Sequence, residues 1–130
     1  MKAMDPTGLV IFTYYDDMDE AVKFYEEALQ LERVYDRGGF MMWSVGGKAF
    51  IGGGPCSEKN KGVEPVGSLM SINVKDCKAV YERVKDMGYK MTEFYFDEEI
   101  PLYTFHIWAP NGYNIEIQQF LSEEDIKMFH

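Results

Sequence analysis

The chain has 130 residues, 46% hydrophobic and 27% charged, a balance that fits one soluble globular domain. Its net charge of −9, from 22 acidic and 13 basic residues, argues against nucleic acid as a partner because phosphates would be repelled. No apolar run reaches the length of a membrane span and the start of the chain, MKAMDPTG, has no signal-peptide core, so we expect a cytoplasmic protein and no membrane contact.

The first half of the chain predicts a strand, a helix and three further strands. Residues 8–15 form an apolar strand pattern, and residues 16–31 place apolar side chains on one helical face. Asp17 lies where it would cap that helix. Gly46 and Gly47 form a favourable hairpin dipeptide between the last two of the three strands. Those three strands are expected at residues 32–37, 40–45 and 48–52.

The second half repeats this order. A strand at residues 68–74 precedes a helix at 76–88, for which Asp76 is the expected cap. Gly, Pro and charged residues fill the segment 55–67, which reads as a linker between the halves. The remaining expected elements are strands at 90–98, 102–108 and 113–120, and a short helix in a C-terminal tail at 122–130.

The two halves also match in spacing. Val10 lies seven residues before Asp17, as Leu69 does before Asp76, and Ile51 lies four residues after Gly47, as Glu116 does after Gly112. The matched order predicts an α+β protein in which a βαβββ module occurs twice, at 8–54 and 68–121, within a single domain of residues 1–130. Each sheet would pack its apolar back on a helix and leave its other face free to build a cup.

Two stretches resemble a known family, the vicinal oxygen chelate superfamily, which includes glyoxalases, extradiol dioxygenases and bleomycin-resistance proteins. Residues 16–31, DDMDEAVKFYEEALQL, are similar to the family's first helix, and residues 109–119, APNGYNIEIQQ, to its last turn and strand. The resemblance covers residues 8–121 and implies the glyoxalase/bleomycin-resistance fold, with a cupped mixed sheet. Gln30 and Ala109 depart from it, since the family usually has Gly and Asp there.

The resemblance also implies where a metal would be held. Metal-using members take their ligands, mostly His, Gln or Glu, from four strand positions that face the cup. The matching positions here are Val10, Ile51, Leu69 and Glu116. Three of these four are apolar, whereas a divalent ion needs about three imidazole or carboxylate ligands. We therefore expect neither a metal site nor another cofactor.

Alternation along the last strands singles out Glu116 and His106 as candidate catalytic residues. Ile115 and Ile117 point away from Glu116, which is expected to look into the cup. His106 shares a face with Trp108, and the sequence leaves open whether that face also lines the cup. The carboxylate is equally open to being a counter-ion or a solvated surface group. Other candidates for contact with a ligand, on faces that alternation turns inward (Trp43 and Trp108 only if they face that way), are Phe12, Tyr14, Trp43, Ser71, Asn73, Trp108, Asn114 and Gln118.

Two classes of function remain open from the sequence. The first is a metal-free small-molecule binding protein, resembling the bleomycin-resistance proteins, that sequesters a hydrophobic or cationic ligand in an aromatic-lined cup as an acidic homodimer. The second is a lyase, isomerase or dioxygenase-like enzyme of the same superfamily, its site rebuilt around Glu116, and with it His106, as general base or metal ligand. A macromolecular ligand is a third reading, supported only by the acidic surface.

Overall fold

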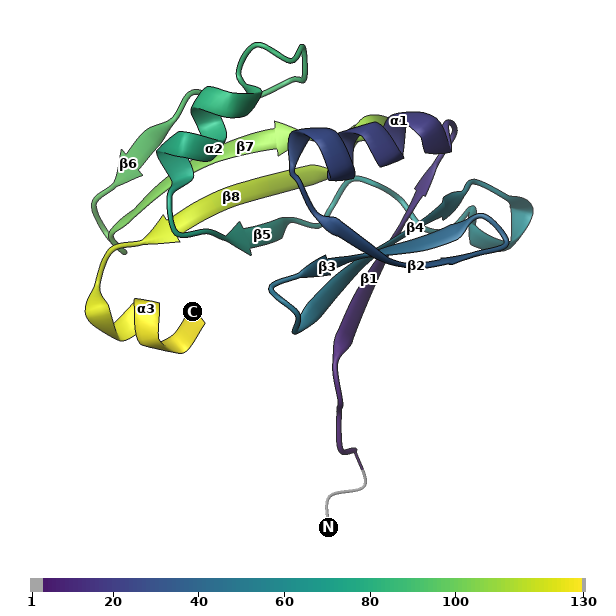
Figure 1. Ribbon diagram of the computed structural model, residues 1–130, viewed down its shortest axis with the longest axis horizontal. Coiled ribbons are helices and arrows are strands. Elements are labelled where there is room, and N and C mark those ends of the chain that lie inside the picture. Colours follow the sequence, from purple (N-terminus) through teal and green to yellow (C-terminus); the bar gives the residue numbers. More distant parts are fainter. Residues whose placement is uncertain (1–3, 130) are drawn as a thin grey trace. The chain divides into compact units, whose positions relative to one another are not determined.

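The computed structural model describes residues 4–129 of the chain (Figure 1). Residues 1–3 and 130, the ends of the expected domain and tail, lie outside the described residues. The chain forms two compact units, Met1–Val63 and Glu64–His130, so that their boundary falls within the segment 55–67. No helix among the described residues combines the length and the apolar character needed to cross a membrane.

The first unit is a four-stranded sheet with one helical segment. Strand β1 pairs parallel with β4, and β3 pairs antiparallel with both β4 and β2, which gives the order β1-β4-β3-β2. Its elements are β1 (Leu9–Tyr15), α1 (Met18–Val22) continued by a π-helical stretch (Lys23–Ala28), β2 (Glu32–Arg37), β3 (Phe40–Val45), β4 (Ala49–Pro55) and a 3-10 turn (Glu58–Asn60). Both Gly46 and Gly47 adopt positive φ, as the predicted β3–β4 hairpin turn requires.

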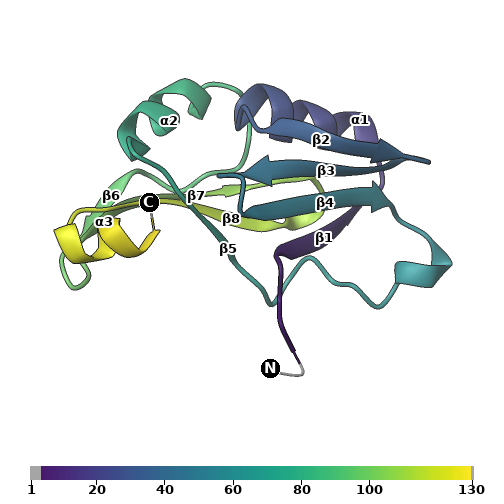
Figure 2. The ribbon, with the colours of Figure 1, turned by 60° about the horizontal axis from the view of Figure 1, so that its bottom comes forward.

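The second unit repeats this topology. Strand β5 pairs parallel with β8, and β7 pairs antiparallel with β8 and β6, in the order β5-β8-β7-β6. Its elements are β5 (Met70–Asn73), α2 (Cys77–Val84), β6 (Tyr95–Asp97), β7 (Leu102–Trp108), a 3-10 turn (Pro110–Gly112), β8 (Asn114–Phe120) and α3 (Glu123–Phe129). The two mixed sheets with their helices confirm the predicted α+β fold (Figure 2).

Each sheet buries one face against its own helix. In the first unit, Tyr25 of the helical segment stacks on Trp43 of β3, with 4.6 Å between the ring centroids. Trp43 also donates its indole N–H to the carboxylate of Glu26 over 3.1 Å, and Arg33 donates two hydrogen bonds to that carboxylate. In the second unit, α2 packs on β7 and β8, where Phe105 is fully buried. The opposite face of each sheet points away from the helical segment in the first unit and from α2 in the second.

The prediction of a strand at residues 90–98 is wrong for the first half of that range. Only Tyr95–Asp97 forms regular strand β6, and Met91 makes an isolated bridge to Ile107. The hydroxyl of Thr92 accepts a hydrogen bond from the backbone N–H of His106 over 2.8 Å. A side chain therefore takes the place of a backbone carbonyl, and the ladder is interrupted there.

Gln30 follows the first helical segment with a φ of +56°, in the left-handed region that favours glycine. We expect Gln30→Gly to raise the free energy of unfolding by about 0.5–1 kcal/mol, since relief of backbone strain exceeds the added entropy of the unfolded chain. Gln30→Ala keeps the Cβ atom and should change the stability by less than about 0.5 kcal/mol. Urea unfolding followed by tryptophan fluorescence compares the variants, and equal midpoints for Gly and Ala would contradict the expectation.

Candidate functional site

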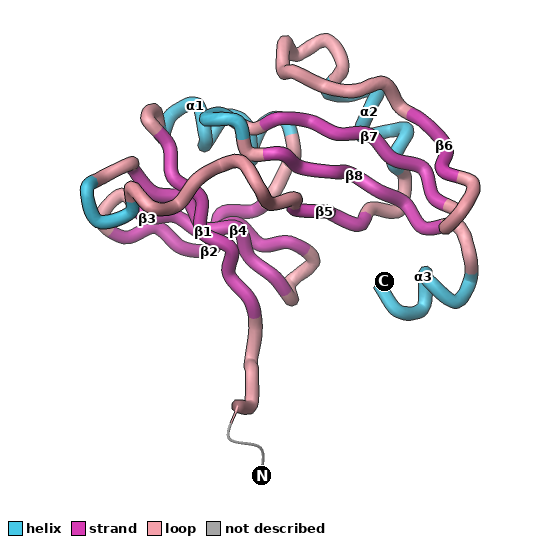
Figure 3. The backbone as a smooth tube through the Cα atoms, turned by 180° about the vertical axis from the view of Figure 1, so that it is seen from behind, coloured by secondary structure: helices cyan, strands magenta, loops and turns pink. Residues whose placement is uncertain are grey.

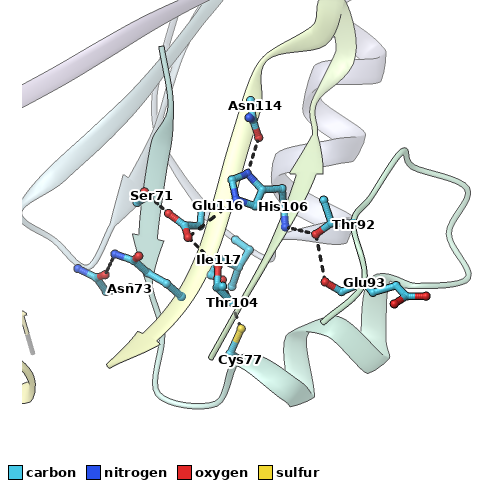
Figure 4. Close-up of polar contacts among 11 residues, drawn as sticks. Ser71, Asn73, Cys77, Thr92, Glu93, Thr104, His106, Asn114, Glu116 and Ile117 are labelled. Carbon is cyan, nitrogen blue, oxygen red and sulfur yellow. Dashed lines mark hydrogen bonds and ion pairs between the residues drawn. The ribbon is translucent and has the colours of Figure 1, made fainter. Parts of the chain in front are cut away.

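The face of the second sheet opposite α2 carries a continuous row of polar side chains (Figure 4). Pairing registers place Glu116 of β8 beside Ser71 of β5 on one side and His106 of β7 on the other. Residues paired across neighbouring strands point to the same face, so the row follows directly from the registers. We call this row the polar face; its members are Ser71, Asn73, Thr104, His106, Trp108, Asn114, Glu116 and Gln118.

Glu116 lies at the centre of the polar face and is held by two hydroxyl groups. Ser71 donates to its Oε1 over 2.8 Å, and Thr104 donates to its Oε2 over 2.7 Å. The Glu116 side chain is 15% exposed. A carboxylate that accepts both of these hydrogen bonds is fixed in orientation, and each oxygen keeps a lone pair for a further donor.

His106 stands directly opposite Glu116. Its Nε2 lies 3.9 Å from Glu116 Oε2, too far for a hydrogen bond, while its Nδ1 lies 3.1 Å from the side-chain oxygen of Asn114. When Nδ1–H donates to Asn114, Nε2 carries a lone pair on the side of the ring near the carboxylate. His106 therefore lies on the same face as Glu116, which the sequence left open.

The two ends of the polar face differ in chemistry. At one end the Lys90 ammonium lies 4.6 Å from the centre of the Trp108 ring, a cation–π contact. Toward the other end, Gln118 donates its amide N–H to Asn73 over 2.7 Å. That pairing leaves the Gln118 carbonyl oxygen as a further acceptor. Around Glu116, the face therefore offers acceptor lone pairs on Gln118 and on Glu116 itself, alongside the amide N–H groups of Asn73 and Asn114.

The corresponding face of the first sheet is aromatic. The Phe12 and Tyr14 rings stack with centroids 6.4 Å apart, and the Phe12 side chain is 37% exposed. Phe40 covers Gly54 from the same side, since a Cβ atom built on Gly54 would lie 2.6 Å from the Phe40 ring. We call this surface the aromatic face; the register places on it Val10, Phe12, Tyr14, Phe40, Met42 and Phe50, together with the polar Ser44.

Two residues expected on this face lie on the other one. Ile51 pairs with Ile11 and Trp43, so all three share the helix-covered face, and both Ile51 and Trp43 are buried. The position that corresponds to Glu116 is Gly52 and not Ile51. Gly52 pairs with Phe12, which lies five residues before the cap Asp17, as Ser71 lies five before Asp76.

The residues at the family's ligand positions do not fit a metal ion. Val10 and Leu69 carry no donor atom, and the Phe12 ring lies where a side chain at Gly52 would begin, 2.6 Å from a Cβ built there. Within residues 4–129, no group of three or more His, Cys, Asp or Glu side chains is arranged to hold a metal. His106 and Glu116 supply one nitrogen and one carboxylate, fewer than the three protein ligands of typical catalytic sites.

Cys77 lies behind the polar face and has a structural environment. Its thiol donates to the Ile117 carbonyl, and its backbone N–H donates to the Gln119 side-chain oxygen. Burial raises the pKa of the Cys77 thiol to about 12, with smaller contributions from the negative charges of Asp76 and Glu116. So high a pKa leaves almost no thiolate at neutral pH, which argues against a nucleophilic cysteine.

Three features of the site were missed from the sequence. Thr104, which alternation along β7 places on the face of His106, was not among the candidate residues, although it holds Glu116. Gly52 was not recognised as the counterpart of Glu116. The third is a cavity of about 210 Å³ near α3, lined by Lys75, Gln119, Phe120 and Ile126. Strand alternation indicated the position of Thr104. Recognising Gly52 requires the pairing register of β4, and the cavity depends on where α3 packs.

Comparison with known proteins agrees with this geometry. Residues 9–117 match the model of the Glyoxalase/Bleomycin resistance protein/Dioxygenase superfamily. No curated protein sequence gives a significant match. Among solved structures, the chain is similar to a glyoxalase/bleomycin resistance protein/dioxygenase from Nocardioides, with 18% identity over 94% of this chain and 88% of that one and a TM-score of 0.71.

Two further solved structures are similar at comparable levels. A lactoylglutathione lyase from Agrobacterium tumefaciens shares 18% identity over 89% of this chain and 96% of its own, with a TM-score of 0.67. A glyoxalase-related enzyme from Fulvimarina pelagi shares 16% identity over 85% of this chain and 86% of its own, with a TM-score of 0.71. Likeness at these identities concerns the fold, whereas the family model spans most of the sequence. The chain belongs to the glyoxalase/bleomycin resistance protein/dioxygenase superfamily.

Proposed function

We propose that the protein binds a small hydrophobic or cationic molecule without a metal ion, and that Glu116 is the carboxylate that recognises it. The observation that carries the proposal is the pair of hydroxyl groups, Ser71 and Thr104, that hold Glu116 on the polar face. The positions from which relatives with a metal take their other ligands carry Val10, Gly52 and Leu69. A fixed carboxylate with no metal partner is suited to a ligand that brings its own positive charge.

The hydrogen-bond inventory supports a ligand rich in N–H donors. Glu116 accepts one hydrogen bond on each side-chain oxygen from the hydroxyls of Ser71 and Thr104. The remaining lone pairs of Glu116, Ser71 and Thr104 can accept hydrogen bonds from donor groups of a ligand. An ammonium, amidinium or guanidinium group supplies several N–H donors and a compensating charge, whereas an anion would meet like charge.

The first unit carries, on its own sheet, a surface suited to a hydrophobic ligand. The Phe12 and Phe40 rings lie against Gly52 and Gly54, where no side chain separates the rings from the backbone. Both rings remain partly exposed. Exposed aromatic rings favour flat apolar groups and also cations, which are attracted to the ring faces.

A direct test compares butylammonium with 1-butanol, which share an apolar chain and differ in the charged donor. We expect NMR titration to give an affinity for butylammonium at least about tenfold higher than for 1-butanol, which matches the net contribution of a hydrogen bond to a charged group. The amide shifts should be centred on Ser71, Thr104 and Glu116. Equal affinities, or shifts spread over the acidic surface with none at these residues, would contradict the proposal.

A second candidate function, an enzyme with Glu116 as general base, is favoured by the position of His106. Its Nε2 lies 3.9 Å from Glu116 Oε2, which leaves room for a substrate atom to contact both groups. Such an enzyme would lose turnover in Glu116→Gln while its stability barely changed. In the binding protein, the same variant loses affinity, and no turnover exists to be lost.

A further inference from the structure

The polar face ends at the cavity beside α3. Phe120 has the same strand parity as Glu116 and Gln118, so its ring lies on the face of β8 that carries them. Phe129 of α3 stacks on Phe120 with 4.8 Å between centroids. Figure 3 shows α3 beside the end of this sheet, away from α2. The helix thus forms a wall at one end of the polar face.

The cavity at that wall is apolar and large enough for part of a ligand. It measures about 210 Å³, and Phe120 and Ile126 supply its apolar side chains. Gln119 also lines it, but the oxygen of that side chain already accepts from the Cys77 backbone N–H. Lys75 is the charged residue among those that line it. The surroundings suit a hydrocarbon group and disfavour a second cation.

We propose that the ligand is a cationic amphiphile, with its charged head at Glu116 and its hydrocarbon tail in the cavity beside α3. The proposal rests on the proposed function of Glu116 and adds the shape and length of the ligand. Phe120 lies four residues after Glu116 along β8, which at about 3.4 Å per residue corresponds to about 14 Å. An extended chain of about ten carbons spans this distance.

The test uses n-alkylammonium ions from butyl to dodecyl, each below its micellar concentration, titrated by calorimetry. The tail should reach the cavity near ten carbons, so affinity should depend little on shorter chain lengths and should then rise up to dodecyl by about fourfold per methylene, the factor that corresponds to about 0.8 kcal/mol for each buried CH₂. Decane-1,10-diamine should bind more weakly than decylammonium, because its second ammonium would enter an apolar cavity beside Lys75. Attraction to the net charge of −9 alone would reverse that order.

Two matched variants locate the tail. Ile126 lines the cavity and is 41% exposed, whereas Met128 of the same helix is 74% exposed and is not among the residues that line it. Ile126→Trp should fill the cavity and abolish the gain with chain length while leaving butylammonium affinity unchanged. Met128→Trp adds the same side chain outside the cavity and should preserve the gain.

The possible failures are distinguishable. If butylammonium binds at Glu116 but affinity does not depend on chain length, or if Ile126→Trp and Met128→Trp show the same gain, the tail site is wrong and the proposed function stands. If no member of the series gives shifts at Ser71 and Glu116, the proposed function is wrong and the tail site falls with it.

Discussion

Gly53→Ala is expected to destabilise the first unit by about 2–3 kcal/mol, the upper part of the range of about 1–3 kcal/mol for a well-packed core forced to accept an extra methyl group. A Cβ atom at Gly53 would lie 2.8 Å from Cζ3 and 3.0 Å from Cη2 of Trp43, which is fully buried. The indole is held by its stack on Tyr25 and its hydrogen bond to Glu26, so it has no free direction in which to move. Urea unfolding followed by tryptophan fluorescence measures the loss.

Gly52→Ala, one residue earlier in β4, is the matched control. Its Cβ would lie 2.6 Å from the Phe12 ring, a shorter contact than at Gly53. Phe12 is partly exposed and can rotate away, so we expect a loss below about 1 kcal/mol. Equal unfolding midpoints for the two variants would mean that Trp43 is not held on the helix-covered face as described.

Glu116→Gln should lower the affinity for butylammonium by about 10–100-fold, since a hydrogen bond to a charged group contributes about 1.5–3 kcal/mol. Glutamine keeps the shape and one acceptor oxygen, while its NH₂ group turns a donor toward the ligand and toward one hydroxyl. The hydroxyls of Ser71 and Thr104 can rotate to accept, so the free energy of unfolding should fall by less than about 1 kcal/mol. NMR titration and urea unfolding of the same sample give both quantities.

The matched control for Glu116→Gln is Glu98→Gln in the turn between β6 and β7. Glu98 is exposed, and its replacement removes the same unit of negative charge from the second unit. Affinity should stay within about twofold of the original value, because exposed charges are screened by salt. If the two variants weaken binding equally, the attraction is a property of the overall charge and Glu116 has no special part in it.

Strands β7 and β8 of the second sheet could be predicted from the sequence because their side chains alternate, whereas β6 is shorter than predicted. In β8, Ile115 and Ile117 separate Asn114, Glu116 and Gln118, so the parity of every side chain is readable. Strand β7 likewise agrees with its predicted bounds. Alternation shows which side chains share a face but not which of them touch. Ser71 and Thr104 each donate to one oxygen of Glu116, and His106 contacts Asn114, because of side-chain rotamers that the sequence does not specify.

The first sheet was harder to predict because its sequence does not show which side chains of each strand share a face. In β4, three successive glycines leave no side chains to alternate, and in β3 Trp43 follows two methionines. Counting four residues from Gly47, as from Gly112, gave Ile51, but the two turns differ. A three-residue turn, residues 46–48, precedes β4, whereas residues 109–113, which include a 3-10 turn, precede β8, so the correspondence shifts by one residue to Gly52.

The measurement that tests metal-free binding most directly is the metal content of the protein, determined by mass spectrometry after loading with Mn, Fe, Ni and Zn and dialysis without chelator. The account predicts far less than one metal ion per chain, unchanged in Glu116→Gln. Near-stoichiometric metal that disappears in Glu116→Gln would contradict it, because Glu116 would then be a metal ligand with partners that Val10, Gly52 and Leu69 do not supply.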